Sequence, residues 1–454
     1  MKTRFSPSPT GQMHLGNVRT ALFSFLFARH ENGLFLLRVE DTDKTRSKPE
    51  FIQLLQDDLK WLGLQWDEGP FFQSQRQDIY NEYYAYLEEH QAVYPCFCND
   101  EQLALSRKIQ ISSGQPPRYM GTCRKLSSTE IDAKIKQGLK PTLRFKVPED
   151  KEIHFQDIVK GPQRFRTDDI GDFIIRRSDG SASFFFCNAI DDSLMGVTHT
   201  IRGEDHLSNT PRQILILNTL NLPIPSYGHL PLILSEEGSA LSKREGSLSL
   251  ESLRTEGYLP SAIHNYLGRL GHYYEKNNFM TLTELAENFL GSHIGKTPAH
   301  FDQTQLYHWQ KLAVMQSHDD SFWQWLNTST QKLIPKDHRK QFIELMRPHV
   351  LFPIEAEKWA KIFYKDIILD QQAKDCLKQS GENFLGLLKE AIEKMGADYA
   401  QVTQTLSQQS GLKGKALFQP LRIALTGETS GPELHGIFNL LGKDGLLEKI
   451  KTSI

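Results

Sequence analysis

The sequence has no long apolar run, no excess of charge of one sign and few cysteines. Crossing a bilayer takes about 20 consecutive apolar residues, and no stretch of the 454 residues provides them. The first residues, Met1-Lys-Thr-Arg-Phe-Ser-Pro, lack the apolar core of a secretory signal. We therefore expect a cytoplasmic protein that binds no membrane. The formal net charge of −2 excludes a globally basic protein, although a local basic face is enough to bind RNA.

The five cysteines are odd in number, and three of them, Cys96, Cys98 and Cys123, lie near one another in the sequence. This spacing argues against a framework of disulfides. It is typical of a metal site or of free thiols in a reducing compartment. Cys187 and Cys376 lie elsewhere, and we expect them to be buried as small apolar residues.

The length of the chain predicts several domains, since one domain takes about 100–200 residues. Within residues 1–95, a Pro/Gly turn precedes an amphipathic helix over 18–30, and a buried strand over 35–39 ends at Glu40-Asp-Thr-Asp43. A second helix is predicted over 51–62. This order favours a doubly wound parallel sheet, in which ligands gather at the carboxyl ends of the strands.

Residues 96–190 interrupt this pattern, and residues 191–255 resume it. From residue 256 onward helical periodicity dominates. We therefore predict a nucleotide-binding domain that is split by an insertion and followed by an all-helical region. The supporting segments are strands over 142–147, 172–177 and 196–202, and helices over 210–220, 341–346, 384–395 and 434–441.

The run Pro7-Ser-Pro-Thr-Gly-Gln-Met-His-Leu-Gly-Asn17 is a tight turn that leads into the first helix. A helix start offers unpaired N–H groups and the positive end of the helix dipole, which suits a polyphosphate. His14 can donate hydrogen bonds to phosphate oxygens, and Gly16 has no Cβ to keep a nucleotide from the backbone. Taken alone, His14, Gly16 and Asn17 are more typical of a plain loop and helix cap. The wider context, Ser6-Pro-Ser-Pro-Thr-Gly11, favours catalysis.

A second motif, Ser242, Lys243 and Arg244, follows the stretch Ser235-Glu-Glu-Gly-Ser239 more than two hundred residues later. A cationic loop can close on a pentavalent phosphate and stabilise the charge of the transition state. Taken alone, Ser-Lys-Arg is usually a solvated surface loop. The two motifs in this order favour adenylate chemistry.

Eight further runs extend these motifs over nearly the whole chain, and with them the sequence resembles bacterial glutamyl-tRNA synthetase. The two motifs above resemble the ATP-handling signatures of class I synthetases, known as HIGH and KMSKS. The other matching runs are Arg4-Phe-Ser-Pro-Ser-Pro-Thr-Gly11, Leu37-Arg-Val-Glu-Asp-Thr-Asp43, Trp61-Leu-Gly-Leu64, Asn188-Ala-Ile-Asp-Asp192, Leu194-Met-Gly-Val-Thr198, Ile201-Arg-Gly-Glu-Asp-His206, Thr210-Pro-Arg212 and Gln419-Pro-Leu-Arg-Ile-Ala-Leu-Thr-Gly427.

The resemblance implies an α/β fold: a Rossmann-like parallel-sheet catalytic domain, an inserted α+β domain and an all-α C-terminal region. The implied parts are the first half of the catalytic domain (1–95), an acceptor-stem-binding insertion with a cysteine knuckle (96–190), the second half of the catalytic domain (191–255), a helical stem-contact domain (256–320) and a helical anticodon-binding domain (321–454).

The resemblance also implies roles for matching residues. The carboxylate side chain of a glutamate substrate would pair with arginine, and the α-ammonium group of that substrate would pair with a carboxylate. Glu40 and Arg202 are alternatively a structural ion pair. For the anticodon, Arg347 and His349 are implied, although a solvated helix end is an equally good interpretation of either alone. Glutamate would meet Arg4, Ser6, Glu40, Asn188 and Arg202, and ATP would meet Ser8, His14, Gly16, Asp205, His206, Ile233 and Lys243.

The cysteine cluster matches the knuckle of some family members. A structural zinc ion takes four ligands, and the family often has His or Cys two residues after the third cysteine. Here that residue is Lys125, a poor ligand, so the candidate set is Cys96, Cys98, Tyr119 and Cys123, as in a related tRNA-modifying paralogue. The alternative is a decayed site with three reduced thiols.

Two positions depart from the family. Ala240 replaces a lysine that normally begins the second motif, and Phe184 replaces a tyrosine whose hydroxyl faces the amino acid. The first change removes a cation, and the second removes a hydrogen bond worth about 0.5–1.5 kcal/mol. Both leave room for a specialised second copy of the enzyme.

The resulting hypothesis is an ATP-dependent glutamate–tRNA ligase of translation. It would use L-glutamate, ATP with Mg²⁺ and tRNA(Glu), tRNA(Gln) or both, and act as a monomer. The alternatives are a catalytically weak tRNA-binding paralogue, a short glutamylating paralogue and a glutaminyl enzyme. The helical C-terminal region argues against the last two.

Overall fold

The computed structural model describes residues 1–43, 45–235, 237–239, 249–381 and 383–453, with side chains described to residue 451. The described chain divides into two compact units. The first comprises Met1–Leu253 and Ile263–Gln303, and the second Arg254–Ala262 and Thr304–Ile454. No described helix has the length and apolarity that a membrane crossing requires. The finer division into five domains stays a prediction.

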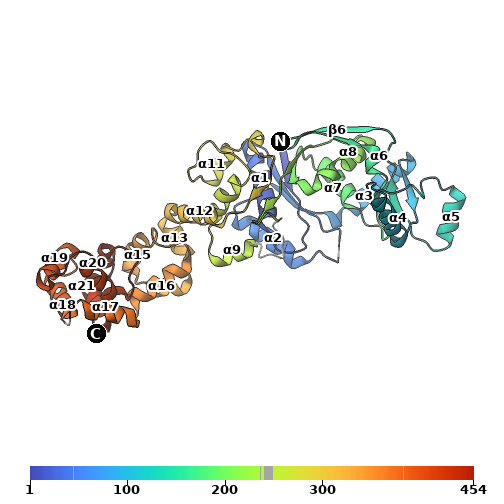
Figure 1. Ribbon diagram of the computed structural model, residues 1–454. Helices are drawn as coiled ribbons and strands as arrows, with labels where there is room; N and C mark the ends of the chain where they lie inside the picture. Colours follow the sequence, from blue (N-terminus) through green and yellow to red (C-terminus); the bar gives the residue numbers. More distant parts are fainter. Residues whose placement is uncertain (44, 236, 240–248, 382, 454) are drawn as a thin grey trace. The chain divides into compact units, whose positions relative to one another are not determined.

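A parallel sheet organises the first unit (Figure 1). Strand β1 (Lys2–Phe5) pairs with β2 (Leu34–Val39), and β2 pairs with β3 (Glu68–Phe72), all in parallel. On the other side of β1 lies β9 (His199–Gly203), which pairs in parallel with β10 (Ser226–Leu230). Hydrogen bonds between Lys2 and Thr198 join the two groups of strands. β1 and β9 are the strands at which the two parallel groups meet, so their carboxyl ends are neighbours, as a binding site at a switch point of strand order requires.

Helix α1 (Leu15–His30) packs against β1, β2 and β9. Most of its residues are buried, because the segment from Ala21 to Ala28 is apolar on nearly every side. The prediction that this helix is amphipathic is therefore wrong, although its position is confirmed. The remaining regular elements around this sheet are α2 (Pro49–Trp61), η1 (Gln73–Gln75), α3 (Gln77–Glu89), α7 (Phe184–Leu194), η2 (Glu204–Asn209), α8 (Thr210–Thr219) and β11 (Ile233–Leu234).

The inserted segment contributes a separate antiparallel sheet and a hairpin. Strand β5 (Thr142–Phe145) pairs with β4 (Val93–Cys96) and with β8 (Phe173–Arg176). The hairpin of β6 (Glu152–Asp157) and β7 (Gly161–Arg166) extends the catalytic sheet instead, because Asp157 of β6 pairs in parallel with Tyr227 of β10. The insertion is therefore tied directly to the sheet that it interrupts. Its helices are α4 (Asp100–Ser112), α5 (Ser128–Lys136) and α6 (Thr167–Ile170).

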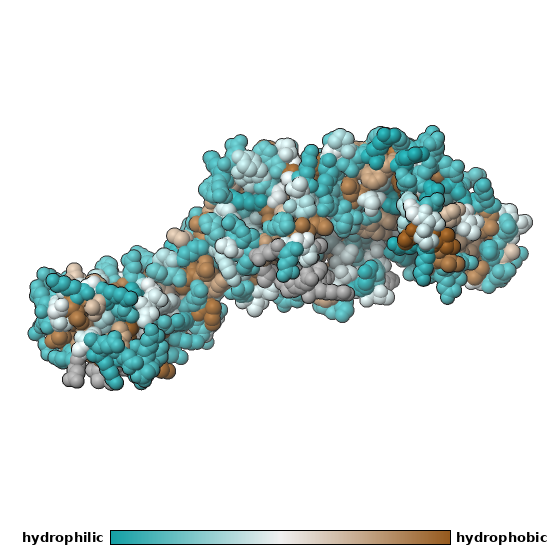
Figure 2. All heavy atoms as spheres, in the orientation of Figure 1, coloured by the Kyte–Doolittle hydropathy of each residue, from teal (hydrophilic) through white to brown (hydrophobic). Residues whose placement is uncertain are grey.

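Helix α4 exposes apolar side chains. Leu105, Ile109 and Ile111 each keep more than half of their surface exposed, as does Met120 in the loop that follows. Figure 2 shows hydrophobic atoms gathered where Figure 1 labels α4, on a face that is otherwise mostly hydrophilic.

The second unit is helical throughout its described residues, and its core is one cluster of buried apolar side chains. In α18 (Phe384–Met395), for example, Phe384, Leu388, Ala391 and Ile392 are buried, which is the spacing of one helix face. The last helix, α21 (Leu434–Ser453), is kinked at Gly442, where φ is 62°. The other helices of this unit are α12 (Gln303–Gln316), α13 (Asp319–Trp325), α14 (Thr328–Leu333), η4 (Lys336–His338), α15 (Arg339–Met346), α16 (Pro353–Tyr364), α17 (Gln371–Gln379), α19 (Tyr399–Ser410) and α20 (Lys415–Thr426).

The segment 250–302 is mostly helical, and its residues belong to the first unit except for Arg254–Ala262, which belong to the second. It contains α9 (Leu250–Glu256), α10 (Pro260–Arg269), α11 (Leu282–Glu287), η3 (Gly291–His293) and β12 (Ala299–His300), which pairs with β11. The predicted strands and helices are confirmed to within a few residues at their ends, except that α21 continues beyond the predicted end at residue 441, across the kink at Gly442. The all-helical C-terminal region is confirmed as well.

Candidate functional site

A cavity of about 540 Å³ opens at the carboxyl ends of β1, β2 and β9. It contains every residue predicted to meet glutamate or ATP except Lys243, which lies outside the described residues together with Ala240, Ser242 and Arg244. The predicted residues in its lining are Arg4, Ser6, Ser8, His14, Gly16, Asn17, Glu40, Asn188, Arg202, Asp205, His206 and Ile233.

His14 caps the helix that begins at the cavity. Its Nδ1 accepts a hydrogen bond from Gly16 N at 3.2 Å, and Asn17 Oδ1 accepts one from His14 N at 3.4 Å. A Cβ on Gly16 would lie 3.0 Å from the His14 ring. Gly16 therefore makes room for the ring of His14. The sequence had suggested a different reason for the glycine, namely access of a nucleotide to the backbone.

Arg202 is buried and held on two sides. Its Nε donates to His229 Nε2 at 3.1 Å, and its Nη2 donates to Thr210 Oγ1 and Gln213 Oε1, both at 2.8 Å. Its Nη1 is buried without a hydrogen-bond partner among the described residues. Burial lowers the pKa of Arg202 to about 10, so the group remains a cation at neutral pH. An unsatisfied buried donor of this kind favours an anionic ligand.

Glu40 faces the same cavity from the end of β2. Asn188 Nδ2 donates to Glu40 Oε1 at 2.5 Å, and Arg38 Nη2 lies 3.5 Å from the same oxygen. Burial raises the pKa of Glu40 against the opposing charges of Arg38 and Arg4. A cationic group bound beside Glu40 would lower that pKa again and stabilise the carboxylate.

A buried charge cluster, which the sequence argument missed, lies beneath these residues. Asp192 Oδ1 pairs with Arg38 Nη2 at 2.8 Å and with Arg4 Nε at 3.2 Å. Burial would raise the pKa of Asp192, but the charges of Arg4 and Arg38 hold it at about 2. An arginine inside the apolar strand Leu34–Val39 was the available signal, because a fully buried charge requires a partner.

The neighbouring Asp191 anchors a second set of side chains. It accepts hydrogen bonds from Arg76 Nε at 2.7 Å, Tyr80 Oη at 2.6 Å and Gln73 Nε2 at 2.9 Å. Helix α7 thus fixes Asn188 in the cavity by burying two consecutive carboxylates, each paired with arginine.

His206 and Phe184 lie together at the cavity wall, with ring centroids 5.1 Å apart. Burial and the charge of Arg202 lower the pKa of His206 to about 4, so its imidazole is neutral at physiological pH. Phe184 presents a bare phenyl ring to the cavity and offers no hydroxyl group to a ligand.

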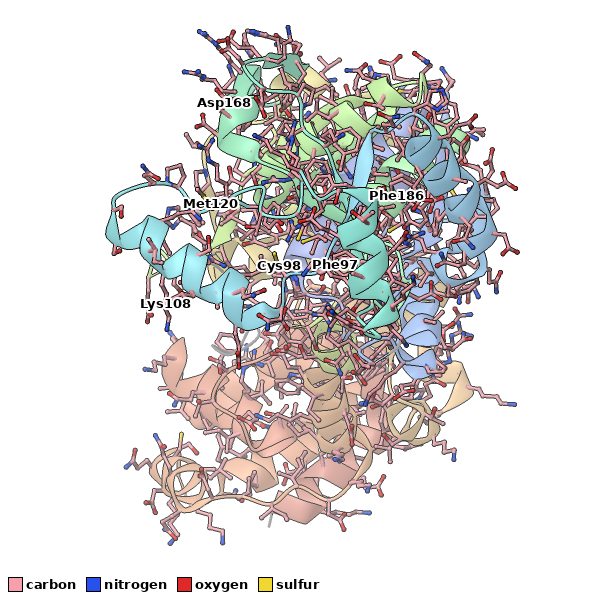
Figure 3. All side chains as sticks on the ribbon, turned by 90° about the vertical axis from the view of Figure 1, so that its right-hand side faces the viewer. Phe97, Cys98, Lys108, Met120, Asp168 and Phe186 are labelled. Atoms are coloured by element: carbon pink, nitrogen blue, oxygen red, sulfur yellow. The ribbon has the colours of Figure 1, made fainter. Side chains whose placement is uncertain are left out.

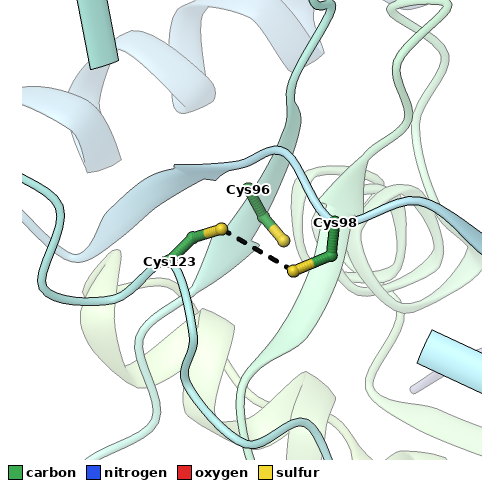
Figure 4. Close-up of side chains that lie close together, drawn as sticks. All are labelled: Cys96, Cys98 and Cys123. Carbon is green, nitrogen blue, oxygen red and sulfur yellow. Dashed lines mark hydrogen bonds between the residues drawn. The ribbon is translucent and has the colours of Figure 1, made fainter. Parts of the chain in front are cut away.

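The three clustered cysteines converge between β4 and the loop before α5, as Figure 4 shows. Their sulfur atoms all lie within 4.8 Å of one another, and Cys98 Sγ lies 3.7 Å from Cys123 Sγ. The Tyr119 hydroxyl is 3.4 Å from both Cys96 Sγ and Cys98 Sγ. In Figure 3, Cys98 stands beside Phe97 at the start of α4, with Lys108 farther along that helix. Lys125 is exposed.

Arg347 and His349 lie in the second unit, at the end of α15 and just after it. Arg347 Nη2 is ion-paired with Asp319, and its guanidinium lies 5.8 Å from the centre of the Phe322 ring. His349 is exposed. Part of the charge of Arg347 is therefore already neutralised within the unit.

Residues 1–308 match the family of class I tRNA synthetases (E and Q), catalytic domain, and residues 306–454 match the anticodon binding domain family. The chain belongs to the class I tRNA synthetases. The resemblance deduced from the sequence motifs is thereby confirmed.

Relatives of this synthetase match it over its full length. The glutamate–tRNA ligase 2 of Coxiella burnetii (strain RSA 331 / Henzerling II) is 50% identical, over 100% of this chain and 99% of that protein. The glutamate–tRNA ligase 2 of Nitrosococcus oceani is 48% identical, over 100% and 98%. A crystal structure of a glutamate tRNA ligase from Elizabethkingia meningosepticum, in complex with its amino acid, superimposes with a TM-score of 0.88 at 27% identity, covering 99% of this chain and 98% of that one.

Proposed function

We propose that this synthetase is a glutamate–tRNA ligase that activates L-glutamate with ATP and transfers it to the terminal adenosine of a tRNA in protein synthesis. The observation that carries the proposal is that one cavity holds a buried cationic donor, Arg202, a buried carboxylate, Glu40, and the capped helix start at His14. Identity of 45–50% to glutamate–tRNA ligases over the whole chain supports the same reaction.

Glutamate would lie between the two charged walls. The side-chain carboxylate of glutamate would meet Arg4 and Arg202, and Nη1 of Arg202, which is unpaired among the described residues, would supply a hydrogen-bond donor. The ammonium group of glutamate would meet Glu40. Asn188 and Ser6 complete the polar lining. A site that binds both charges of the substrate in this way favours glutamate over apolar or cationic amino acids, because either would leave a buried charge unpaired.

ATP would occupy the part of the cavity near the start of α1. His14 and Gly16 border the helix N-terminus that would receive the phosphates. The neutral ring of His206 adds no charge there, while Ser8, Asp205 and Ile233 line the surrounding wall. The sequence assigns Asn17, Ser242, Lys243 and Arg244 to catalysis as well. Mg²⁺ accompanies ATP and supplies charge neutralisation when bound.

The two steps require positioning and electrostatic stabilisation rather than a protein nucleophile. An α-carboxylate oxygen of glutamate attacks the α-phosphorus of ATP, and the bond to pyrophosphate breaks, which leaves glutamyl adenylate. A hydroxyl of the terminal tRNA adenosine then attacks the acyl carbon, loses its proton and displaces AMP.

The cysteine cluster fits a structural zinc ion. Tetrahedral zinc, with bonds of about 2.3 Å to sulfur and 2.0 Å to oxygen, places two sulfurs about 3.8 Å apart and a sulfur and an oxygen about 3.5 Å apart. The Cys98–Cys123 separation of 3.7 Å and the two contacts of 3.4 Å from Tyr119 match these values. Cys96, Cys98, Tyr119 and Cys123 would hold the ion and fix the loop before α5 to strand β4.

The RNA-binding surfaces would lie on the insertion and on the second unit. A groove of about 460 Å³ in the insertion is lined by Lys140, Arg176 and Arg177, which suits phosphates. Arg347 and His349 would contact the anticodon. The tRNA would be tRNA(Glu), tRNA(Gln) or both, and the enzyme a cytoplasmic monomer.

The test is ATP–pyrophosphate exchange with glutamate and each purified tRNA, followed by charging of each tRNA. We expect exchange and charging that depend on glutamate. Absence of exchange with every tRNA would overturn the proposal and favour a tRNA-binding paralogue, for which the bare phenyl ring of Phe184 in the cavity is the specific observation.

A further inference from the structure

A continuous chain of hydrogen bonds crosses the walls of the cavity with Arg202 at its centre. On one side, Arg202 Nη2 donates to Gln213 Oε1 at 2.8 Å, and Gln213 Nε2 donates to Asn188 Oδ1 at 2.9 Å. Asn188 Nδ2 then donates to Glu40 Oε1 at 2.5 Å. Three consecutive bonds therefore connect the arginine to the carboxylate on the opposite wall.

On the other side the chain runs through His229. Arg202 Nε lies 3.1 Å from His229 Nε2, and His229 Nδ1 lies 2.5 Å from Asp157 Oδ2. Asp157 Oδ1 also accepts hydrogen bonds from the backbone N–H groups of Val159 and Lys160, at 2.9 and 2.8 Å. Asp157 is the last residue of strand β6 in the insertion. The series of hydrogen bonds therefore begins in the inserted segment and ends at Glu40, which follows β2.

The chemistry of the groups fixes the direction of every bond. A guanidinium only donates and a carboxylate only accepts. His229 must therefore accept from Arg202 at Nε2 and donate to Asp157 from Nδ1, which requires a neutral imidazole. Burial lowers the pKa of His229, consistent with the neutral form. By the same logic Gln213 must turn its oxygen to Arg202, and Asn188 must turn its nitrogen to Glu40.

All six side chains are almost completely removed from water. Asp157 and His229 are 0% exposed, Asn188 and Gln213 are 1% exposed, and Arg202 and Glu40 are 4% and 8% exposed. Hydrogen bonds in such surroundings are strong, and a broken one leaves an unsatisfied buried group. Each member is therefore held in one orientation by its neighbours.

We propose that His229 and Gln213 are positioning residues for the substrate glutamate: His229 aligns the guanidinium of Arg202, and Gln213 sets the amide of Asn188. Neither residue borders the cavity itself. The proposal rests on the assignment of Arg202, Asn188 and Glu40 to glutamate. It adds that the orientation of these side chains is set by a series of hydrogen bonds that extends into the inserted segment.

A pair of variants at one position tests the His229 half of the proposal. In His229→Gln the amide oxygen can take the place of Nε2 and accept the hydrogen bond from Arg202. In His229→Asn the shorter side chain can replace only Nδ1, so the hydrogen bond to Asp157 is kept and the one from Arg202 is lost. We expect His229→Asn to raise the KM for glutamate by at least about tenfold, and His229→Gln to raise it less. The KM for ATP should stay within about twofold of wild type in both, because the hydrogen bonds described for the His229 side chain go to Arg202, Thr210 and Asp157, none of which is assigned to ATP.

Gln213→Glu tests the other half. The new carboxylate still accepts from Arg202, but it has no hydrogen to donate to Asn188 Oδ1. The amide of Asn188 must then turn its nitrogen away from Glu40. We expect a higher KM for glutamate, by roughly tenfold, even though a stronger ion pair with Arg202 has been added.

His264→Asn is the matched control, since His264 is buried in the same unit and bonds only to the Leu62 carbonyl among the contacts described for it. It should lower the melting temperature without changing the KM for glutamate. Unchanged glutamate KM in folded His229→Asn and Gln213→Glu, or an equal rise in the control, would overturn the proposal. Failure of the wild-type enzyme to charge any tRNA would instead overturn the proposed function.

Discussion

The backbones of His14 and Ser249 pair as an antiparallel bridge. Beside the bridge, Leu250 N donates a hydrogen bond to Met13 O at 2.9 Å, and Gln12 Nε2 donates to Glu251. The chain that follows the second motif therefore joins the turn that carries the first one. Two signatures more than two hundred residues apart in sequence are connected through the turn before α1, which is the physical basis for treating them as parts of one site.

Gly16→Ala should reduce activity without reducing stability. The added Cβ would lie 3.0 Å from the His14 ring, so the ring must shift by a few tenths of an ångström, which weakens the cap that it forms. Loss of the cap costs about 1 kcal/mol, and replacing glycine by alanine in a helix returns about 1 kcal/mol. We expect kcat/KM for ATP to fall by roughly tenfold, while thermal unfolding remains unchanged.

Gly268→Ala in α10 is the control for that variant, since the nearest atom to its Cβ would be 3.6 Å away, an ordinary contact. It should leave kcat/KM unchanged. Equal activity of Gly16→Ala and wild type would show that the position of the His14 ring is irrelevant to ATP.

Glu40→Gln should weaken glutamate binding. The amide keeps the shape of the side chain but removes the charge assigned to the substrate ammonium, and a hydrogen bond to a charged group is worth about 1.5–3 kcal/mol. We expect kcat/KM for glutamate to fall by roughly 10- to 100-fold. Asp41→Asn is the neighbouring control, because Asp41 bonds to Ser74 rather than lining the cavity. A similar loss in both variants would point to a general structural effect.

Much of the fold and site follows from local patterns. The helix predicted over 18–30 begins at Leu15 because His14 caps it, and the turn before it was already visible as Pro-Thr-Gly. Most of the glutamate and ATP residues were predicted because they belong to contiguous motifs that resemble the family, whereas Ile233 lies outside those motifs and was implied by the resemblance alone. The partners that orient them were not, since His229, Gln213 and Asp157 lie outside those motifs and meet only in the folded chain.

Cys98→Ser should remove zinc. We expect about one zinc ion per chain in the purified enzyme and almost none in the variant, with a lower melting temperature, because a structural zinc site with a lost thiolate ligand binds poorly. The measurement is elemental analysis combined with thermal unfolding. Cys376→Ser, in the second unit and outside the cluster, should retain the metal. A wild-type enzyme free of zinc would contradict the assignment of the cluster.

Ala240→Lys should raise turnover without changing tRNA choice. The substitution restores the cation that the family normally carries at the start of the second motif, and an added positive charge stabilises developing phosphate charge. We expect a several-fold increase in kcat with each tRNA in the same proportion, measured by charging purified tRNAs separately. Glu237→Lys, which adds charge at an exposed position nearby, should have no such effect. A change in which tRNA is charged would contradict the idea that the side chain at position 240 affects only the phosphates of ATP.

Acid should destabilise the enzyme in part through His264. Burial lowers the pKa of His264 to about 4 in the folded chain, while an unfolded histidine titrates near 6.5. Between these values the unfolded state binds a proton that the folded state does not, so stability is lost as the pH falls from about 6.5 towards 4. At pH 5 the loss from this residue should be about 2 kcal/mol. The free energy of unfolding in urea, measured at pH 7.5 and pH 5 for wild type and His264→Asn, isolates this contribution because the other histidines are common to both. The variant should lose less stability on acidification than wild type, and an equal loss would mean that His264 is not held neutral by burial.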